Sequence, residues 1–189
     1  MYTIISPPFT LKFTSMSKED LSAYYSWVMN NKSERLSILA ETVSSTPGYS
    51  SWKNDFTRDS LLVLGRWFYE NIEVTKRSVL DRLKAKLVLK NNVTIENLKL
   101  TNKTYSLAFD VGLYLASVFI KEHPQLQWIH NIHTRKDDAD YGQPVLNGFG
   151  KLVFNPIRKM VITAYAFVKK SKTPSSILEL YSLWESYIS

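Results

Sequence analysis

One segment, residues 104–121, restricts the fold of this chain more than any other. Its sequence, TYSLAFDVGLYLASVFIK, places apolar side chains on nearly every side of a helix. A helix without a polar face has to be covered by other elements all round, so we expect it to be the central buried helix of a domain. The apolar run is short for a membrane span and contains Asp110, so we expect no membrane insertion.

Asp110 is the residue of this helix that most needs an explanation. A carboxylate in apolar surroundings has to be ion-paired, hydrogen-bonded or protonated, because burial disfavours its charge. The structural interpretation is an ion pair with Arg35, Arg158 or Lys159, and the functional interpretation is a carboxylate of a binding or catalytic site. We expect Asp110 to be buried and favour the ion pair.

Helix and strand signals flank the central segment. Ser17 precedes apolar residues at helical spacing and reads as an N-cap. Asn155 and Pro156 are the N-cap and first residue of a helix that runs to about residue 170, and Thr173-Pro174 starts a final helix. The alternation of residues 9–13, FTLKF, predicts a short strand near the N-terminus.

Beyond Pro124 the apolar period changes from 3.6 to 2, which predicts strands. The dipeptide Asn147-Gly148 lies between two apolar runs and predicts the type I′ turn of a hairpin. We therefore predict an α+β fold: a mainly helical single domain spanning residues 1–189, with a small antiparallel β-hairpin sheet at about residues 126–154 followed by two C-terminal helices.

The chemistry-bearing residues of the predicted sheet give no recognisable catalytic motif. His130 shares a strand face with Leu126 and Trp128 and is predicted to be a hydrogen-bonded core histidine, on the opposite face from His133. The acidic residues 137, 138 and 140 read as a solvated hairpin loop, with a divalent cation as the alternative. Gly148-Phe149-Gly150 lacks the third glycine and the following helix of a dinucleotide site. We expect no cofactor and no bound metal.

The charged residues are unevenly distributed along the chain. The chain carries a net charge of +7, and residues 74–103 hold eight basic residues against two acidic ones. This basic segment, with Lys84, Lys86 and Lys90 at its centre, could attract an acidic protein or nucleic acid. It contains no aromatic residue to stack on bases, which favours a protein partner.

Composition indicates a compartment. The chain contains no cysteine, which excludes disulfides and thiolate chemistry and fits a reducing environment. Its first residues lack the basic start and apolar run of a signal peptide. We expect a cytoplasmic protein.

Four stretches in order, SKEDLSAYYSWVMNNKSERLSIL, DSLLVLGRWFYENI, SLAFDVGLYLASVFIKEHPQLQW and DYGQPVLNGFGKLVFNPIRKMVITAYAF, resemble a family of small hypothetical bacterial proteins. The resemblance covers most of the chain from Ser17 onward. It implies an intracellular protein of a bacterium, bacteriophage or mobile element, and it implies no activity and no functional residue.

Taken together, these features predict a non-enzymatic protein-binding module, such as an immunity protein or an accessory subunit of a bacterial or phage conflict system. One alternative is a nucleic-acid-binding protein that uses the basic segment, and a weaker one is an enzyme centred on Asp110 or on residues 137–140. The candidate partner-binding residues are Lys84, Lys86, Lys90, Asp138, Asp140 and Tyr141, and the candidate buried polar residues are Asp110 and His130.

Overall fold

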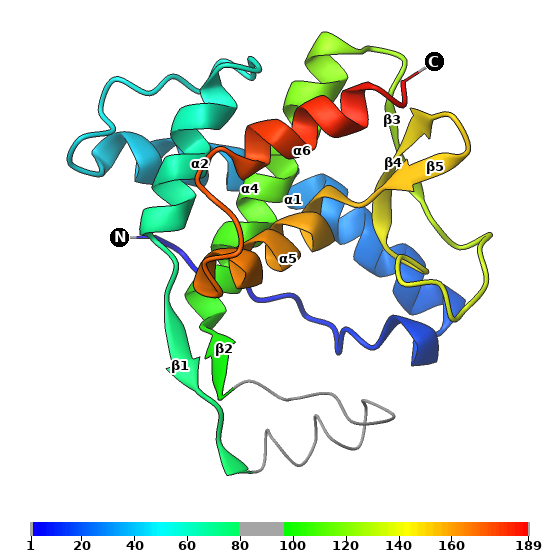
Figure 1. Cartoon of the computed structure of the whole chain (residues 1–189). Coiled ribbons are helices and arrows are strands. Elements are labelled where there is room, and N and C mark those ends of the chain that lie inside the picture. The colour runs from blue at the N-terminus through cyan, green and yellow to red at the C-terminus, as the bar shows by residue number, and fades with distance from the viewer. Residues whose placement is uncertain (1, 80–96, 189) are drawn as a thin grey trace.

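The computed structural model describes residues 2–79 and 97–188 (Figure 1). These residues form an α+β fold, as predicted, with five α-helices and two small antiparallel sheets. In chain order the elements are a 3-10 turn (Phe13–Ser15), α1 (Lys18–Ser45), α2 (Ser60–Glu70), β1 (Val74–Lys76), β2 (Leu98–Leu100), α4 (Asn102–Glu122), β3 (Gln127–His130), β4 (Pro144–Phe149), β5 (Leu152–Phe154), α5 (Pro156–Val168) and α6 (Ser176–Glu185).

Helix α4 passes through the middle of the molecule and is its core, as its sequence predicted (Figure 1). Val111, Leu115 and Phe119 are completely buried. The other helices pack around α4, the three-stranded sheet contacts it through Phe119, and α5 comes close to it at Gly112. A Cβ atom on Gly112 would lie 2.7 Å from the Ile157 Cα, so the absence of a side chain allows this contact.

The helix ends follow the predicted capping residues. The Ser17 side chain accepts a hydrogen bond from the Asp20 N–H at 3.0 Å, and α1 continues without a break from there to Ser45. At the start of α5 the Asn155 side chain accepts from the Arg158 N–H at 2.9 Å. The last helix begins at Ser176, shortly after the predicted start.

The sheet has the order β3-β4-β5, but the prediction for its turn was wrong. Asn147-Gly148 is a bulge inside β4, and the two-residue hairpin loop is Gly150-Lys151. Had the turn been at Asn147-Gly148, Phe149 and Phe154 would share one strand at odd spacing and point to opposite faces. In the observed hairpin they lie on different strands, and both rings contact Phe119, with centroid distances of 5.4 and 5.3 Å. Burial of both rings explains the register.

The predicted strand at residues 9–13 was also wrong. Residues 2–12, which we call the N-terminal arm, contain neither helix nor strand. The rings of Phe9 and Phe13 pack against Tyr24 of α1 at 5.8 and 5.2 Å instead of facing a sheet. Pro7 and Pro8 cannot donate backbone hydrogen bonds, which further disfavours a strand here.

Candidate functional site

The centre of the molecule holds an ion pair between α1 and α4. Arg35 donates from Nε to Asp110 Oδ1 at 2.8 Å and from Nη2 to Asp110 Oδ2 at 2.6 Å. The exposed fractions of the two residues are 4% and 0%. Of the three partners considered from the sequence, Arg35 is therefore the one that Asp110 has. Two parallel hydrogen bonds between planar groups are the strongest arrangement for such a pair.

The N-terminal arm completes this cluster. The Tyr2 hydroxyl donates to Asp110 and lies 2.7 Å from the Ser106 hydroxyl oxygen. Arg35 Nη1 donates to the Thr3 carbonyl at 2.9 Å, and the Ile5 N–H donates to Ser106 at 2.8 Å. The arm is thus fixed to the core at one end by the same groups that satisfy the buried charges.

Burial and pairing act in opposite directions on the ionisation of this cluster. Loss of hydration raises the pKa of the Asp110 carboxyl, and the hydrogen bonds and charge of Arg35 offset part of that rise. Loss of hydration would lower the pKa of Arg35, but the hydrogen bonds and charge of Asp110 outweigh it and raise the pKa. Burial followed by the negative charge of Asp110 raises the pKa of Tyr2, so its hydroxyl keeps its proton.

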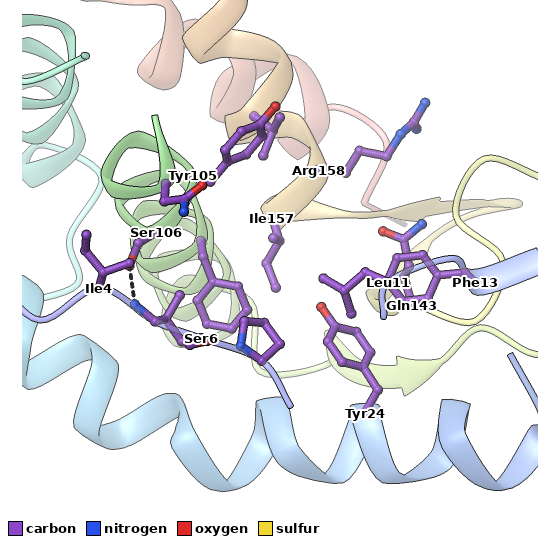
Figure 2. Close-up of a pocket in the computed structure, with 15 residues that line it drawn as sticks. Ile4, Ser6, Leu11, Phe13, Tyr24, Tyr105, Ser106, Gln143, Ile157 and Arg158 are labelled. Atoms are coloured by element: carbon purple, nitrogen blue, oxygen red, sulfur yellow. Dashed lines mark hydrogen bonds between the residues drawn. The ribbon is translucent and has the colours of Figure 1, made fainter. Parts of the chain in front are cut away.

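A pocket of about 520 Å³ lies beside this cluster, between the N-terminal arm, α4 and α5 (Figure 2). We call it the arm pocket. Figure 2 shows Ile4, Ser6 and Ser106 at one end and Leu11, Phe13 and Gln143 at the other, with Ile157 between them. Ile4 and Leu11 are 48% and 44% exposed, so the arm forms an apolar rim that faces solvent. The volume is within the range of small-molecule sites.

Several polar groups that line the arm pocket are already bonded to the protein. Ser106 is part of the ion-pair cluster, and the Tyr105 hydroxyl lies 2.8 Å from that of Tyr165. The Gln143 side chain donates to the Ala139 carbonyl and accepts from Asn155. The interior therefore offers mainly apolar contact to an occupant.

A second candidate site lies on the other side of α5. Helices α5 and α6 both pack on α4 and leave a groove of about 260 Å³, which we call the α5–α6 groove. Ile162 and Leu183 are 47% and 54% exposed there, so both apolar side chains face solvent. The groove is lined by Lys159, Ile162, Thr163, Lys172, Ser176, Glu179, Leu180 and Leu183.

His130 is half-buried on β3, and its ring stacks on Tyr25 at a centroid distance of 5.2 Å. Burial lowers the pKa of His130, against the effect of a hydrogen bond with the backbone of Gly142. Its Nε2 atom is buried and has no hydrogen-bond partner among the described residues. The predicted hydrogen bond is therefore present on one side of the ring only.

The acidic loop between β3 and β4 does not gather its side chains into one site. Asp140 accepts from Asn155 at 2.9 Å and pairs with Arg158 at 3.3 Å, which ties the loop to the start of α5. Asp138 is exposed and accepts from the Asp140 N–H. Tyr141 is 5% exposed, so little of its side chain is accessible to a partner, and its role in partner binding stays a prediction.

Only the ends of the basic segment are described. Lys84, Lys86 and Lys90 lie outside the described residues. At one end, Lys103 pairs with Glu73 at 2.6 Å, which partly neutralises the positive charge beside β1 and β2.

Two further findings concern metals and membranes. Across residues 2–79 and 97–188, no three acidic or histidine side chains are grouped so that they could hold a metal ion. Nor does any helix in these ranges combine the length and apolar character needed to cross a membrane.

A comparison of the chain with models of protein families gives no match, and neither do comparisons with curated proteins and with solved structures. The resemblance to small bacterial proteins therefore stays a prediction, and the function of the chain has to be inferred from the two sites described above.

Both sites include residues that the sequence did not single out. Tyr2 and Ile4 gave no signal, and Leu11 was assigned to a strand, because the role of all three depends on where the irregular arm lies. Ile162 did give one: the buried positions of α5 are Met160, Ala164 and Phe167, and Ile162 falls off that stripe. An apolar residue on the solvent face of an amphipathic helix is a detectable sign of a further contact.

Proposed function

We propose that this chain is a non-enzymatic protein-binding module whose α5–α6 groove receives an acidic amphipathic helix of a partner protein. The observation that carries the proposal is the exposure of Ile162 and Leu183 on adjacent helices that line one groove. An amphipathic helix that lays its apolar face into such a groove is a recurring mode of recognition.

The apolar part of the contact follows from helix packing. Ile162 and Leu183 are already about half-buried, so covering the rest of each side chain stabilises a complex by roughly 0.7–1.5 kcal/mol, before the costs of association. Leu180, half-buried between them, extends the apolar floor of the groove. A partner helix with apolar residues three and four positions apart would present a matching stripe.

The charges of the groove favour an acidic partner. Lys159 lies beside Trp184, with its Nζ atom 5.6 Å from the ring centroid, and Lys172 also lines the groove and is exposed. Glu179, the acidic residue of the lining, already accepts a hydrogen bond from Ser175. Two lysines at the rim would pair with carboxylates that flank the apolar stripe of the partner and speed its approach.

The surroundings of Asp110 support a role other than catalysis. Both of its oxygens are engaged by Arg35, and Tyr2 adds a further donor.

The partner that we propose is either a toxin that this chain neutralises or a larger subunit of a bacterial or phage conflict system.

The proposal is tested by affinity purification of the whole chain from cells that produce it, with nuclease added and the captured proteins identified by mass spectrometry. Ile162→Asp and Leu183→Asp should each lose the captured partner, since a buried carboxylate opposes docking. Leu152→Asp is the matched control, because Leu152 is 46% exposed on β5, outside the groove lining.

The identified partner should bind through an acidic helical segment, and a synthetic peptide of that segment should compete with it. Capture that is equal in all four proteins would contradict the groove as the docking site. Capture that disappears on nuclease treatment would favour the nucleic-acid alternative.

A further inference from the structure

The arm pocket lies on the opposite side of α5 from the groove proposed for the protein partner, and it calls for a different occupant. Val161 lines the pocket and its neighbour Ile162 lines the groove. Likewise, Arg158 lines the pocket and Lys159 lines the groove. The two sites can therefore be altered separately by changing adjacent residues of one helix.

The shape of the arm pocket indicates a small molecule. Its outer wall is the arm, which is held at one end by Tyr2 and at the other by the Phe9 and Phe13 rings on α1. Between these two attachments the arm spans the space beside α4 and α5 (Figure 2). A pocket of about 520 Å³ behind such a narrow wall suits a slender ligand better than the bulk of a protein segment.

The lining selects an apolar ligand. The side chains of Phe109, Ile157 and Val161 form the inner wall, and Ile5, Leu11 and Phe13 face them from the arm side. Because Ser106, Tyr105 and Gln143 already have partners within the protein, a ligand with many polar groups would lose hydrogen bonds to water and find few replacements. A hydrocarbon chain forms no hydrogen bonds to water and therefore loses none on entering the pocket.

One end of the pocket carries a positive charge. Arg158 is at the rim, where 38% of its side chain is exposed, and Asp140 contacts one of its nitrogens, Nη1, at a long distance of 3.3 Å. A guanidinium has five N–H donors in a planar fork, so this contact leaves donors that can bind a carboxylate. The Gln143 side chain lies at the same end of the pocket (Figure 2).

We propose that the arm pocket binds a single-chain anionic amphiphile of the fatty-acid class, with its hydrocarbon chain between the arm and helices α4 and α5 and its carboxylate at Arg158. This inference goes beyond the proposed protein-binding function and does not depend on it, because it involves other residues. The ligand adds contacts between the arm and α5, so the folded state with its arm in place binds it and is stabilised by mass action.

The test uses dodecanoate at concentrations below those at which it forms micelles, with dodecanol as the uncharged match of the same chain length. Dodecanoate should raise the melting temperature of the parent protein and bind saturably in calorimetry. Dodecanol should bind roughly two- to fivefold more weakly, the difference expected for one exposed ion pair. Arg158→Gln should remove this difference, and Lys159→Gln, one residue along, should keep it.

The apolar part of the site is tested by filling it. Val161→Trp should abolish binding of dodecanoate, and Ile162→Trp should leave it unchanged. If Val161→Trp does not fold, Leu11→Asp serves in its place: Leu11 is exposed, and a carboxylate there would repel the ligand. Absence of saturable binding, binding unaffected by Val161→Trp and Leu11→Asp, or equal affinity for dodecanoate and dodecanol would each overturn the proposal.

Discussion

Arg35 and Asp110 lie 75 residues apart in the chain and form two parallel hydrogen bonds, at 2.8 and 2.6 Å, in the interior of the molecule. This pair joins the middle of α1 to the middle of α4, and the N-terminal arm attaches to the same two residues. Removing either charge leaves the other buried without its partner, so the pair should have a large effect on stability.

Asp110→Ala should lower the free energy of unfolding by about 3–5 kcal/mol, since the Arg35 guanidinium would remain buried and unpaired. The double variant Arg35→Met, Asp110→Leu should be more stable than Asp110→Ala, because it removes both charges. Urea denaturation of the parent, of Arg35→Met and Asp110→Leu singly, and of the double variant measures the coupling between the two residues. An Asp110→Ala variant as stable as the parent would contradict the assignment.

Tyr2→Phe should lower stability by about 1–2 kcal/mol, because it removes a hydroxyl bonded to the buried carboxylate while it keeps the ring. It should also speed hydrogen exchange at the Ile5 N–H, which reports whether the arm stays attached. Tyr25→Phe is the control, because the Tyr25 hydroxyl donates to the Trp128 carbonyl at 3.2 Å and not to a residue of the arm cluster. Equal exchange at Ile5 in parent and variant would show that Tyr2 does not hold the arm.

Gly112→Ala should lower stability by about 3 kcal/mol, the upper end for overpacking. The new Cβ would lie 2.7 Å from the Ile157 Cα and 2.9 Å from its backbone nitrogen, and backbone atoms cannot move aside as a side chain can. The same change in an exposed helix would add about 1 kcal/mol, so the sign of the effect is diagnostic. Ser117→Ala, at a half-buried position of α4, should change stability little.

At alkaline pH the protein should lose stability as its buried tyrosines are forced to ionise. Burial, then the hydrogen bond and charge of Glu70, raise the pKa of Tyr49 to about 12, and burial raises that of Tyr24 as well. A pKa that is higher in the folded state contributes stability below the unfolded value and loses it as the pH rises. The free energy of unfolding should therefore decline from about pH 10, the ordinary tyrosine pKa, toward pH 12.

Urea denaturation across this range, together with the phenolate absorbance of the folded protein, gives the measurement. Tyr49→Phe should show a smaller decline than the parent. Ordinary ionisation of all tyrosines near pH 10 without loss of stability would show that these side chains are not shielded from water.

The parts of the fold that depend on local patterns were predictable. The position of α4 was predictable because a helix that is apolar on every side is stable only when other elements cover it, at the centre of a domain. The caps at Ser17 and Asn155 were predictable because a cap involves only residues within one turn. Charge alone reduced the possible partners of Asp110 to three basic residues. Which of them pairs with Asp110 depends on how α1 packs on α4, and that packing could not be predicted from the sequence.

The errors have a common physical origin in long-range contacts. Asn147-Gly148 has the residues of a tight turn, but burial of Phe149 and Phe154 against Phe119 moves the turn by three residues. The arm alternates as a strand does, yet its aromatic rings are buried on α1. The arm pocket is formed by segments distant in the chain, so no local pattern could locate it. The α5–α6 groove lies between consecutive helices, and the apolar Ile162 on the solvent face of α5 was its one local sign.

The attachment of the arm also sets an order of events during synthesis. The contacts of Tyr2 with Ser106 and Asp110 span 104 and 108 residues, so the arm is made long before its binding site. At translation rates of about 5–20 residues per second, that delay is roughly 5–20 s. During this time Arg35 has no carboxylate to pair with, and α1 has no central helix to pack on. The N-terminal arm is therefore made before its binding site and can reach its final position only after α4 has been synthesised.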